Sequence, residues 1–288
     1  MEAIALPDAV ATALASPVDG GRITVESGGV PWSAIVWGDP GGRPLLLVHG
    51  VTASAAVWWR VGPALAATGR RVMAVDQAGH GRTGHWTGHH RFRDNAVDIA
   101  GFIRTAGLDR PELQVIGHSW GAVTAAALPI AGIRPATMVL LDPPVLSLAR
   151  MALEVSDPGQ QPAATLEEAV AAIHAAEPMW DAGDVRAKAE ALIQVDFEAA
   201  RAILLDNGDW DGGLADLRDP SAGGIDTWLV RGDPATGGYI DDAAVTRFEE
   251  LLGRDHVITI TGGPHSPQRT HPRETLAAFL RALGASGS

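Results

Sequence analysis

The sequence of 288 residues contains no cysteine. Disulfide bonds, a thiolate nucleophile, iron–sulfur clusters and cysteine-ligated zinc sites are therefore excluded, because each of them needs a cysteine sulfur. Lysine is almost as scarce, since Lys188 is the sole lysine among 22 basic residues. The pattern around Lys188 predicts a surface helix, so catalysis through a lysine Schiff base is not expected.

Positive charge is scarce as a whole. The 22 Lys and Arg residues are outnumbered by 34 Asp and Glu residues, which gives a formal net charge of −12. Nucleic acids and anionic membranes carry dense negative charge, so we expect neither as a partner. No apolar run approaches the roughly 20 residues that span a bilayer.

The first residues of the chain are acidic rather than basic and lack the basic region of a secretory signal. We interpret residues 1–20 as an N-terminal leader, either frayed or forming a short surface helix. The expected compartment is cytoplasmic.

Short apolar runs alternate with helical patterns along the chain. Two segments on either side of Gly28 and Gly29 predict an antiparallel hairpin. Further strands are predicted at residues 45–48, 72–75, 113–116, 138–141, 227–230 and 257–260. Helices are predicted at residues 54–68, 94–106, 120–131, 243–252 and 270–283. This alternation predicts an α/β fold with a mostly parallel sheet and right-handed crossovers.

One segment, residues 146–219, breaks the alternation, because no strand pattern is found across residues 144–226. Helices are predicted there at residues 165–176, 184–195 and 196–207, and the first of them opens with a capping box. We expect this segment to form a helical cap (lid) on a core made of residues 21–145 and 220–288. Trp180 and Trp210 within it are candidate substrate contacts, or they only attach the cap to the core.

The motif that carries the chemistry lies at residues 115–122. An apolar strand leads into Gly-x-Ser-x-Gly, and an alanine-rich helix follows. Glycines at this spacing permit a tight turn that presents the Ser119 hydroxyl above the sheet, and the new helix directs its N–H groups to the same place. This arrangement predicts Ser119 as a nucleophile.

A second motif, at residues 47–51, is a strand that ends in His49 and Gly50. A fold with a nucleophile elbow takes its oxyanion hole from this loop and from the residue after the serine. The expected donors are therefore the backbone N–H groups of Val51 and Trp120. We expect His49 and Gly50 to lie at the substrate, with His49 ordering the loop rather than transferring a proton.

His265 is the expected general base. It follows the last predicted strand and precedes the last helix, where a hydrolase with the chain order serine, acid, histidine carries its base. His271, at the start of that helix, is expected at the surface.

Together these motifs resemble the α/β-hydrolase superfamily over about residues 22–283. The matching segments are residues 49–50, the Asp-x-x-Gly-His-Gly-x-Thr segment at 76–83, the elbow, and residues 141–144 and 264–266. The resemblance implies an α/β-hydrolase fold: eight strands, mostly parallel, with helices on both faces and a helical cap inserted after the sixth strand. It also implies that residues 76–83 form a structural loop that shapes the site entrance.

The acid of the triad is ambiguous. Most members of the superfamily carry it three residues beyond a glycine after the seventh strand, but that position is Ala235 here, and the segment offers only Asp233. Some relatives carry the acid at the end of the sixth strand, which is Asp142. We prefer Asp142, because two prolines follow it and would fix its carboxylate, and we keep Asp233 as the alternative.

Four histidines, His80, His85, His89 and His90, gather in one loop. A metal site is conceivable in such a loop, but its glycines and the missing acidic ligands favour a polar loop. We expect no metal and no cofactor.

The sequence therefore predicts a cofactor-independent serine hydrolase of esterase or lactonase type. It would cleave a small, partly apolar substrate through an acyl-enzyme on Ser119. Dehalogenases and epoxide hydrolases of the superfamily need an aspartate nucleophile, so the serine argues against both. A carbon–carbon bond hydrolase or perhydrolase with the same triad, and a non-catalytic small-molecule-binding relative, are the alternatives. We expect a monomer or a homodimer.

Overall fold

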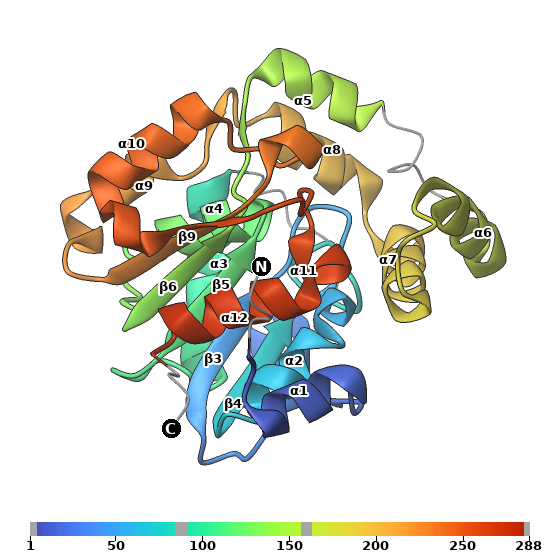
Figure 1. The fold of residues 1–288 in the computed structure, drawn as a ribbon, viewed down its shortest axis with the longest axis horizontal. Helices are drawn as coiled ribbons and strands as arrows, with labels where there is room; N and C mark the ends of the chain where they lie inside the picture. The colour runs from blue at the N-terminus through green and yellow to red at the C-terminus, as the bar shows by residue number, and fades with distance from the viewer. Residues whose placement is uncertain (1–4, 84–90, 157–162, 285–288) are drawn as a thin grey trace.

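The computed structural model describes residues 5–83, 91–156 and 163–284, and its centre is an eight-stranded sheet (Figure 1). The strands are β1 (Gly21–Ser27), β2 (Val30–Trp37), β3 (Arg43–Val48), β4 (Arg70–Val75), β5 (Gln114–His118), β6 (Thr137–Leu141), β9 (Asp226–Gly232) and β10 (Val257–Ile260). Their order is β1-β2-β4-β3-β5-β6-β9-β10. Strand β2 is antiparallel to both of its neighbours, and the other pairs are parallel. The predicted mostly parallel sheet is confirmed.

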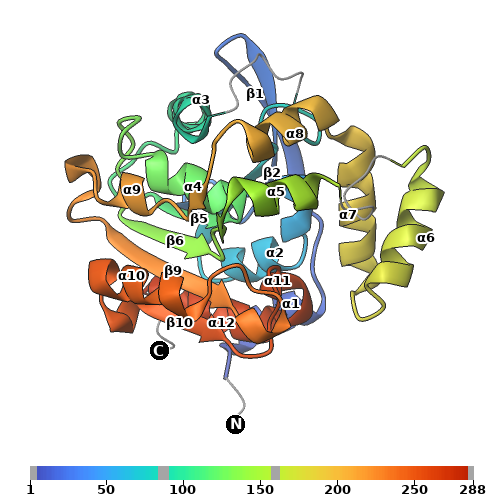
Figure 2. The same cartoon turned by 90° about the horizontal axis from the view of Figure 1, so that it is seen from above.

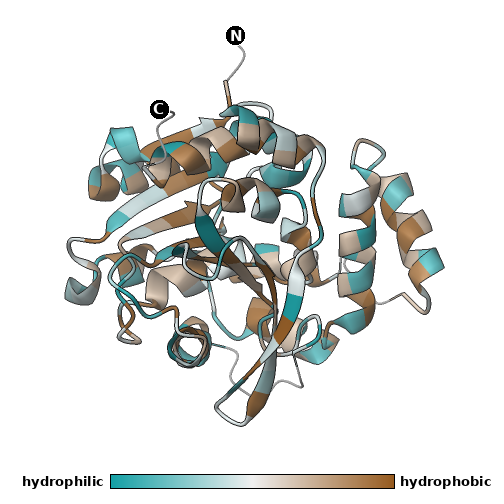
Figure 3. Cartoon of the chain, turned by 90° about the horizontal axis from the view of Figure 1, so that it is seen from below, coloured by the Kyte–Doolittle hydropathy of each residue, from teal (hydrophilic) through white to brown (hydrophobic). Residues whose placement is uncertain are grey.

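Helices cover both faces of this sheet (Figure 2). One face carries α3 (Phe92–Thr105), α4 (Trp120–Ala127) and α10 (Asp242–Leu252), and the other carries α1 (Asp8–Ala15), α2 (Val61–Ala66) and α12 (Pro272–Ala282). Alternate side chains of β3 enter the two layers: Leu46 packs in the first, and Leu45 and Leu47 pack in the second. A strand buried on both sides reads as a continuous apolar run, as the brown strands in Figure 3 show.

Prolines shift two of the predicted helix starts. The helix predicted at residues 54–68 is a 3₁₀ turn, η1 (Ala55–Trp58), followed by α2. Pro63 lies in the first turn of α2, and Pro272 is the first residue of α12. Proline has no N–H to donate, so it is tolerated where the helix has no acceptor for one. A separate short helix, α11 (Pro267–Thr270), precedes α12, and His271 lies between them.

Of the two expectations for residues 1–20, a frayed leader or a short helix, the described residues contain the helix, α1, and it packs on the core. Leu6, Val10 and Leu14 are buried in the same apolar cluster as α2 and α12. Val10 and Leu14 are four residues apart and therefore lie on one face of the helix, and Leu6 lies just before it. This spacing is present in the sequence, but the docking was not predicted from it.

Between β6 and β9 the chain is mainly helical. This insertion contains α5 (Leu148–Val155), α6 (Leu166–Ala176), α7 (Ala182–Gln194), α8 (Phe197–Leu205) and α9 (Leu214–Leu217). Thr165 caps the start of α6, as the predicted capping box requires of it, because Thr165 Oγ1 accepts the N–H of Glu168 at 3.2 Å. Helices α5 and α9 were not predicted.

Two short strands, β7 (Val145–Leu146) and β8 (Trp210–Asp211), pair antiparallel where the insertion leaves and rejoins the core. The expectation that this part of the chain holds no strand is therefore wrong. Two residues are too few to show an alternating pattern.

In Figure 1, α5 and α8 lie over the sheet beyond α4, and α6 and α7 form a pair at its side. None of the helices in the described part of the chain combines the length and hydropathy needed to cross a membrane.

The loop after β4 is braced by a buried carboxylate. Asp76 is fully buried, and its oxygens accept the N–H of Ala55 at 2.7 Å and the guanidinium of Arg22 at 2.8 Å. Thr83 Oγ1 donates to the carbonyl of Asp76 at 2.6 Å and accepts the N–H of Ser33 at 2.9 Å. The loop of residues 76–83 thereby joins β1, β2 and η1, as its expected structural role requires.

We predict that Asp76→Ala lowers the free energy of unfolding by about 3 kcal/mol, since a buried N–H and a guanidinium lose their acceptor. Urea denaturation followed by circular dichroism measures this loss. Asp39→Ala is the control, because the Asp39 carboxylate is exposed and bonds within its own turn. A loss under about 1 kcal/mol for Asp76→Ala would contradict the bracing role.

Candidate active site

Ser119 occupies the turn between β5 and α4. Its φ is +55°, in the left-handed region that strains a residue with a side chain. Its N–H donates to the carbonyl of Leu141 at 2.9 Å, which ties the turn to the end of β6. Helix α4 begins directly after it, at Trp120.

Close packing explains the two glycines of the motif. A Cβ atom on Gly117 would lie 2.2 Å from the carbonyl oxygen of Gly121, and a Cβ atom on Gly121 would lie 2.4 Å from the carbonyl oxygen of Val48. Helix α4 can therefore approach β3 and β5 only when both positions lack a side chain.

The ring of His265 lies between Ser119 and Asp142. Its Nε2 atom is 3.0 Å from Ser119 Oγ, and its Nδ1 atom is 2.7 Å from Asp142 Oδ2. A carboxylate can only accept, so Nδ1 carries the ring proton and Nε2 is left to accept the serine hydroxyl proton. This geometry suits proton abstraction from Ser119.

Two backbone groups fix the Asp142 carboxylate. Asp142 is fully buried at the end of β6, with a φ of +42°. Its Oδ1 accepts the N–H of Gly232 at 2.9 Å, and its Oδ2 accepts the N–H of Tyr239 at 3.0 Å. The carboxylate thus has one orientation, toward His265.

Asp233 has a different environment. Its Oδ2 accepts the N–H of Gly262 at 3.0 Å and its Oδ1 accepts the N–H of Ala235 at 2.9 Å. These bonds, that from Gly262 first, lower the pKa of Asp233 below its ordinary value. Neither oxygen bonds to His265 within the described structure; instead they tie the loop after β9 to the loop after β10.

Two further rings flank His265, and sequence reasoning singled out neither. The ring of Tyr239, the only tyrosine in the chain, has its centroid 4.0 Å from that of His265. His118 Nε2–H donates to the carbonyl of His265 at 2.9 Å. Burial, followed by the nearby charge of His265, holds the pKa of His118 well below its usual value, so His118 is a neutral ring. The position of His118 directly before Ser119 was the sequence signal that could have identified it as a residue of the site.

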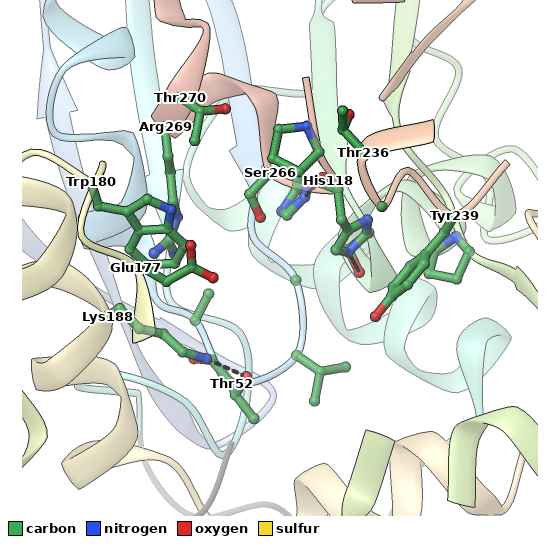
Figure 4. A pocket seen from close by; sticks show the side chains of 18 of the residues that line it. Thr52, His118, Glu177, Trp180, Lys188, Thr236, Tyr239, Ser266, Arg269 and Thr270 are labelled. Atoms are coloured by element: carbon green, nitrogen blue, oxygen red, sulfur yellow. Dashed lines mark hydrogen bonds between the residues drawn. The ribbon is translucent and has the colours of Figure 1, made fainter. Parts of the chain in front are cut away.

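A cavity of about 810 Å³ opens over Ser119, between the core loops and the insertion (Figure 4). Four residues expected at the substrate or the oxyanion hole line it: Gly50, Val51, Trp180 and Trp210. The segment after β3 passes directly against the serine, because a Cβ atom on Gly50 would lie 2.9 Å from that of Ser119. The N–H of Trp120 belongs to the first residue of α4.

His49 does not reach the cavity, so the expectation that it lies at the substrate is wrong. Its ring is fully buried, its Nδ1–H donates to the carbonyl of Gly50 at 2.8 Å, and its Nε2 accepts the N–H of Gln77 at 3.0 Å. Both ring nitrogens are used inside the protein, which fits the loop-ordering role.

Lys188 is not a surface residue, contrary to the sequence expectation. It is buried and lines the cavity, and its Nζ donates to Thr52 Oγ1 at 2.8 Å and to the Thr52 carbonyl at 3.2 Å. His271, also expected at the surface, is half-buried and lines the cavity as well. Helix α7 packs against α6 and η1, and Lys188 lies on its buried part, whereas Arg186 on the same helix is exposed.

The histidine-rich loop can be described only in part, because His85, His89 and His90 lie outside the described residues. His80 is fully buried and packs on the ring of Trp120, with centroids 5.2 Å apart. Burial lowers the pKa of His80 to about 3, so this ring is neutral.

This chain belongs to the alpha/beta hydrolase fold family, whose family model matches residues 43–228. Lipase LipV of Mycobacterium tuberculosis is 27% identical over 86% of this chain and 96% of its own length. The 2-(acetamidomethylene)succinate hydrolase of Mesorhizobium japonicum is 28% identical over 93% of this chain and 94% of its own length. A crystal structure of E-2-(acetamidomethylene)succinate hydrolase has the same fold, with a TM-score of 0.74, 22% identity, and coverage of 92% of this chain and 99% of that chain. These relatives are hydrolases, which supports hydrolysis as the reaction class.

We predict that Asp233→Asn lowers the melting temperature at pH 7, because Asn cannot replace a carboxylate that braces two loops. The folded pKa of Asp233 is depressed, so its stabilisation is present above the unfolded value of about 3.9 and is lost as the pH falls through the folded value. The difference in melting temperature should therefore narrow as the pH falls from about 5 through the folded pKa of Asp233. Thermal scans along a pH series measure it, with Asp39→Asn as control. A difference that is constant with pH would refute the charge-dependent brace.

Proposed function

We propose that the protein is a serine hydrolase that cleaves a carboxylic ester or lactone of a small, partly apolar substrate without a cofactor. The observation that carries the proposal is the continuous hydrogen-bonded chain from Ser119 Oγ through His265 to Asp142. Ser119 and His265 both line the cavity. The relative that is named a lipase agrees with ester cleavage.

In the first step Ser119 Oγ attacks the substrate carbonyl carbon while His265 Nε2 takes the hydroxyl proton. Asp142 stabilises the imidazolium that forms and keeps the ring in the required tautomer. The negative charge moves to the carbonyl oxygen, and we propose the N–H groups of Val51 and Trp120 as its hydrogen-bond donors. Each such donor contributes about 10²–10³ in rate where this has been measured.

In the second step the tetrahedral intermediate collapses. The bond to the alcohol oxygen breaks, and His265 gives its proton to that oxygen, which leaves an acyl group on Ser119. Water then attacks the acyl carbon while His265 again takes a proton, and the acid is released as Ser119 regains its hydrogen.

We further propose that residues 146–219 act as the cap of a core formed by residues 21–145 and 220–288. Trp180 and Trp210 of the insertion line the cavity above Ser119. Trp210 also packs edge-on against Phe92, with centroids 4.7 Å apart. Both roles that the sequence left open for Trp210 are therefore proposed: contact with the substrate and attachment of the cap to the core.

We predict that Ser119→Ala abolishes ester turnover and labelling by a fluorophosphonate probe, while circular dichroism and melting temperature stay close to those of the wild type. Loss of a triad nucleophile typically costs about 10⁴–10⁶ in kcat. Ser266→Ala is the matched control, because it removes another hydroxyl from the same cavity and should keep the labelling. Turnover by Ser119→Ala within about tenfold of wild type would end the serine-hydrolase proposal.

We predict that Asp142→Asn lowers kcat by about 10⁴, since an asparagine favours the wrong tautomer of His265. Asp233→Asn should reduce kcat far less, because its carboxylate braces loops and does not bond to the imidazole. Steady-state kinetics on one activated ester, with both variants above 90% folded by circular dichroism, separates the two. A larger loss for Asp233→Asn would assign the acid to Asp233.

A further inference from the structure

One side of the cavity carries two buried cationic side chains. Arg269, on α11, is 6% exposed and Lys188, on α7, is 7% exposed, and both line the cavity. Figure 4 shows them on the side that also carries Trp180 and Glu177, while Tyr239 lies on the opposite side. The mechanism above uses neither cation.

Two nitrogens of the Arg269 guanidinium have no hydrogen-bond partner among the described residues. They are Nε and Nη1, and both are buried. The ring of Trp180, with its centroid 4.2 Å from Cζ, orients the group by a cation–π contact. A buried charge without hydrogen bonds is unfavourable, so these two donors are unsatisfied within the described structure.

The nearest carboxylates do not satisfy these donors. Asp184 and Glu177 both attract Arg269, but neither forms a direct ion pair with it in the described structure. Asp184 accepts the indole N–H of Trp59 at 3.1 Å, and its other oxygen is 3.8 Å from Arg60. Asp184 Oδ2 has no hydrogen-bond partner among the described residues, so Asp184 offsets the charge of Arg269 without satisfying its donors. Glu177 is an exposed side chain at the rim.

The second cation lies next to the oxyanion loop. Lys188 Nζ is held by the hydroxyl and the carbonyl of Thr52, the residue that follows Val51. Its charge therefore adds to that of Arg269 on the side of the cavity nearest the insertion.

We propose that Arg269 and Lys188 form a subsite for a carboxylate that the substrate carries in addition to its scissile bond. The planar fork of a guanidinium offers two parallel N–H donors that match the two oxygens of a carboxylate. The other wall of the cavity is apolar, with Met151, Leu204 and Trp210. The substrate class is then a compact ester or lactone with a carboxylate at one end and an apolar part at the other. This inference rests on the proposed function.

Glu177 gives the proposal a second, opposite test. Its carboxylate lies on the same side of the cavity and attracts Arg269 when no substrate is bound. A substrate carboxylate would compete with it and be repelled by it. Removing the charge of Glu177 should therefore improve binding of an anionic substrate, whereas removing that of Arg269 should weaken it.

The experiment compares two pairs of esters that differ only in a carboxylate. The first pair is 4-nitrophenyl hydrogen adipate and 4-nitrophenyl hexanoate, which tests a carboxylate on the acyl side. The second pair is 4-acetoxybenzoate and its methyl ester, which tests one on the alcohol side. For each pair, kcat and KM are measured for wild type, Arg269→Gln, Glu177→Gln and Arg186→Gln. Arg186 is the matched control, because it lies on the same helix as Lys188 but is exposed and bonds to Glu190.

The wild type should favour the acid over its neutral partner in at least one pair. In that pair Arg269→Gln should lower the acid-to-neutral ratio of kcat/KM at least tenfold, mainly through KM. Glu177→Gln should raise the ratio about threefold, and Arg186→Gln should leave it unchanged. Free adipate should inhibit the wild type competitively, a readout that does not depend on any variant folding.

Three results would overturn the subsite: preference for the neutral ester in both pairs, equal losses for acid and neutral ester in Arg269→Gln, or no inhibition by adipate. The proposed function survives each of these results if the neutral ester is still cleaved in a Ser119-dependent way. Absence of turnover together with absence of fluorophosphonate labelling at Ser119 would instead reject the hydrolase proposal itself.

Discussion

The turn at Ser119 is the constraint on which the geometry of the site depends. A serine with φ of +55° costs about 1–3 kcal/mol and persists only where the surroundings determine it. Here α4 packs directly onto β3 and β5 because Gly117 and Gly121 leave no side chain between them. The serine hydroxyl is thereby fixed at the carboxyl edge of the sheet. The loops after β3, β6, β9 and β10 begin at the same edge, which is where parallel sheets bind ligands.

The sequence was sufficient for the features that depend on local pattern and chain order. Six strands were found because parallel strands covered on both faces read as short apolar runs, and the hairpin of β1 and β2 was found from the two glycines of its turn. Ser119 and His265 were found because the first lies between a strand and a helix and the second follows the last strand. Asp142 and Asp233 could not be separated in this way, since each ends an apolar strand. The two carboxylates differ in their hydrogen bonds. Asp233 accepts N–H groups from its own turn and from the loop after β10, whereas Asp142 accepts an N–H group from β9 and bonds to His265.

The features that the sequence did not predict depend on packing between distant segments. Lys188 was assigned to the surface because a helical period does not reveal that α7 packs against both α6 and η1. His49 was assigned to the substrate from its place beside Gly50, but its ring turns inward to a backbone N–H some 28 residues later. Arg269 follows His265 by four residues, and nothing in its neighbours along the chain shows that its charge is buried.

Tyr239 links the proposed acid and base in a way that bears on how the site can change. Its N–H holds the Asp142 carboxylate while its ring covers His265. The carboxylate itself follows β6, so the segment after β9 contributes to this pair only the N–H group of Tyr239 and one face of its ring. Because this segment holds Asp142 through the backbone N–H of Tyr239, the side chain of Thr236, which lines the cavity, can be exchanged without removing a hydrogen bond to that carboxylate. A change at Thr236 would therefore alter the wall of the cavity and leave the proposed acid and base in place.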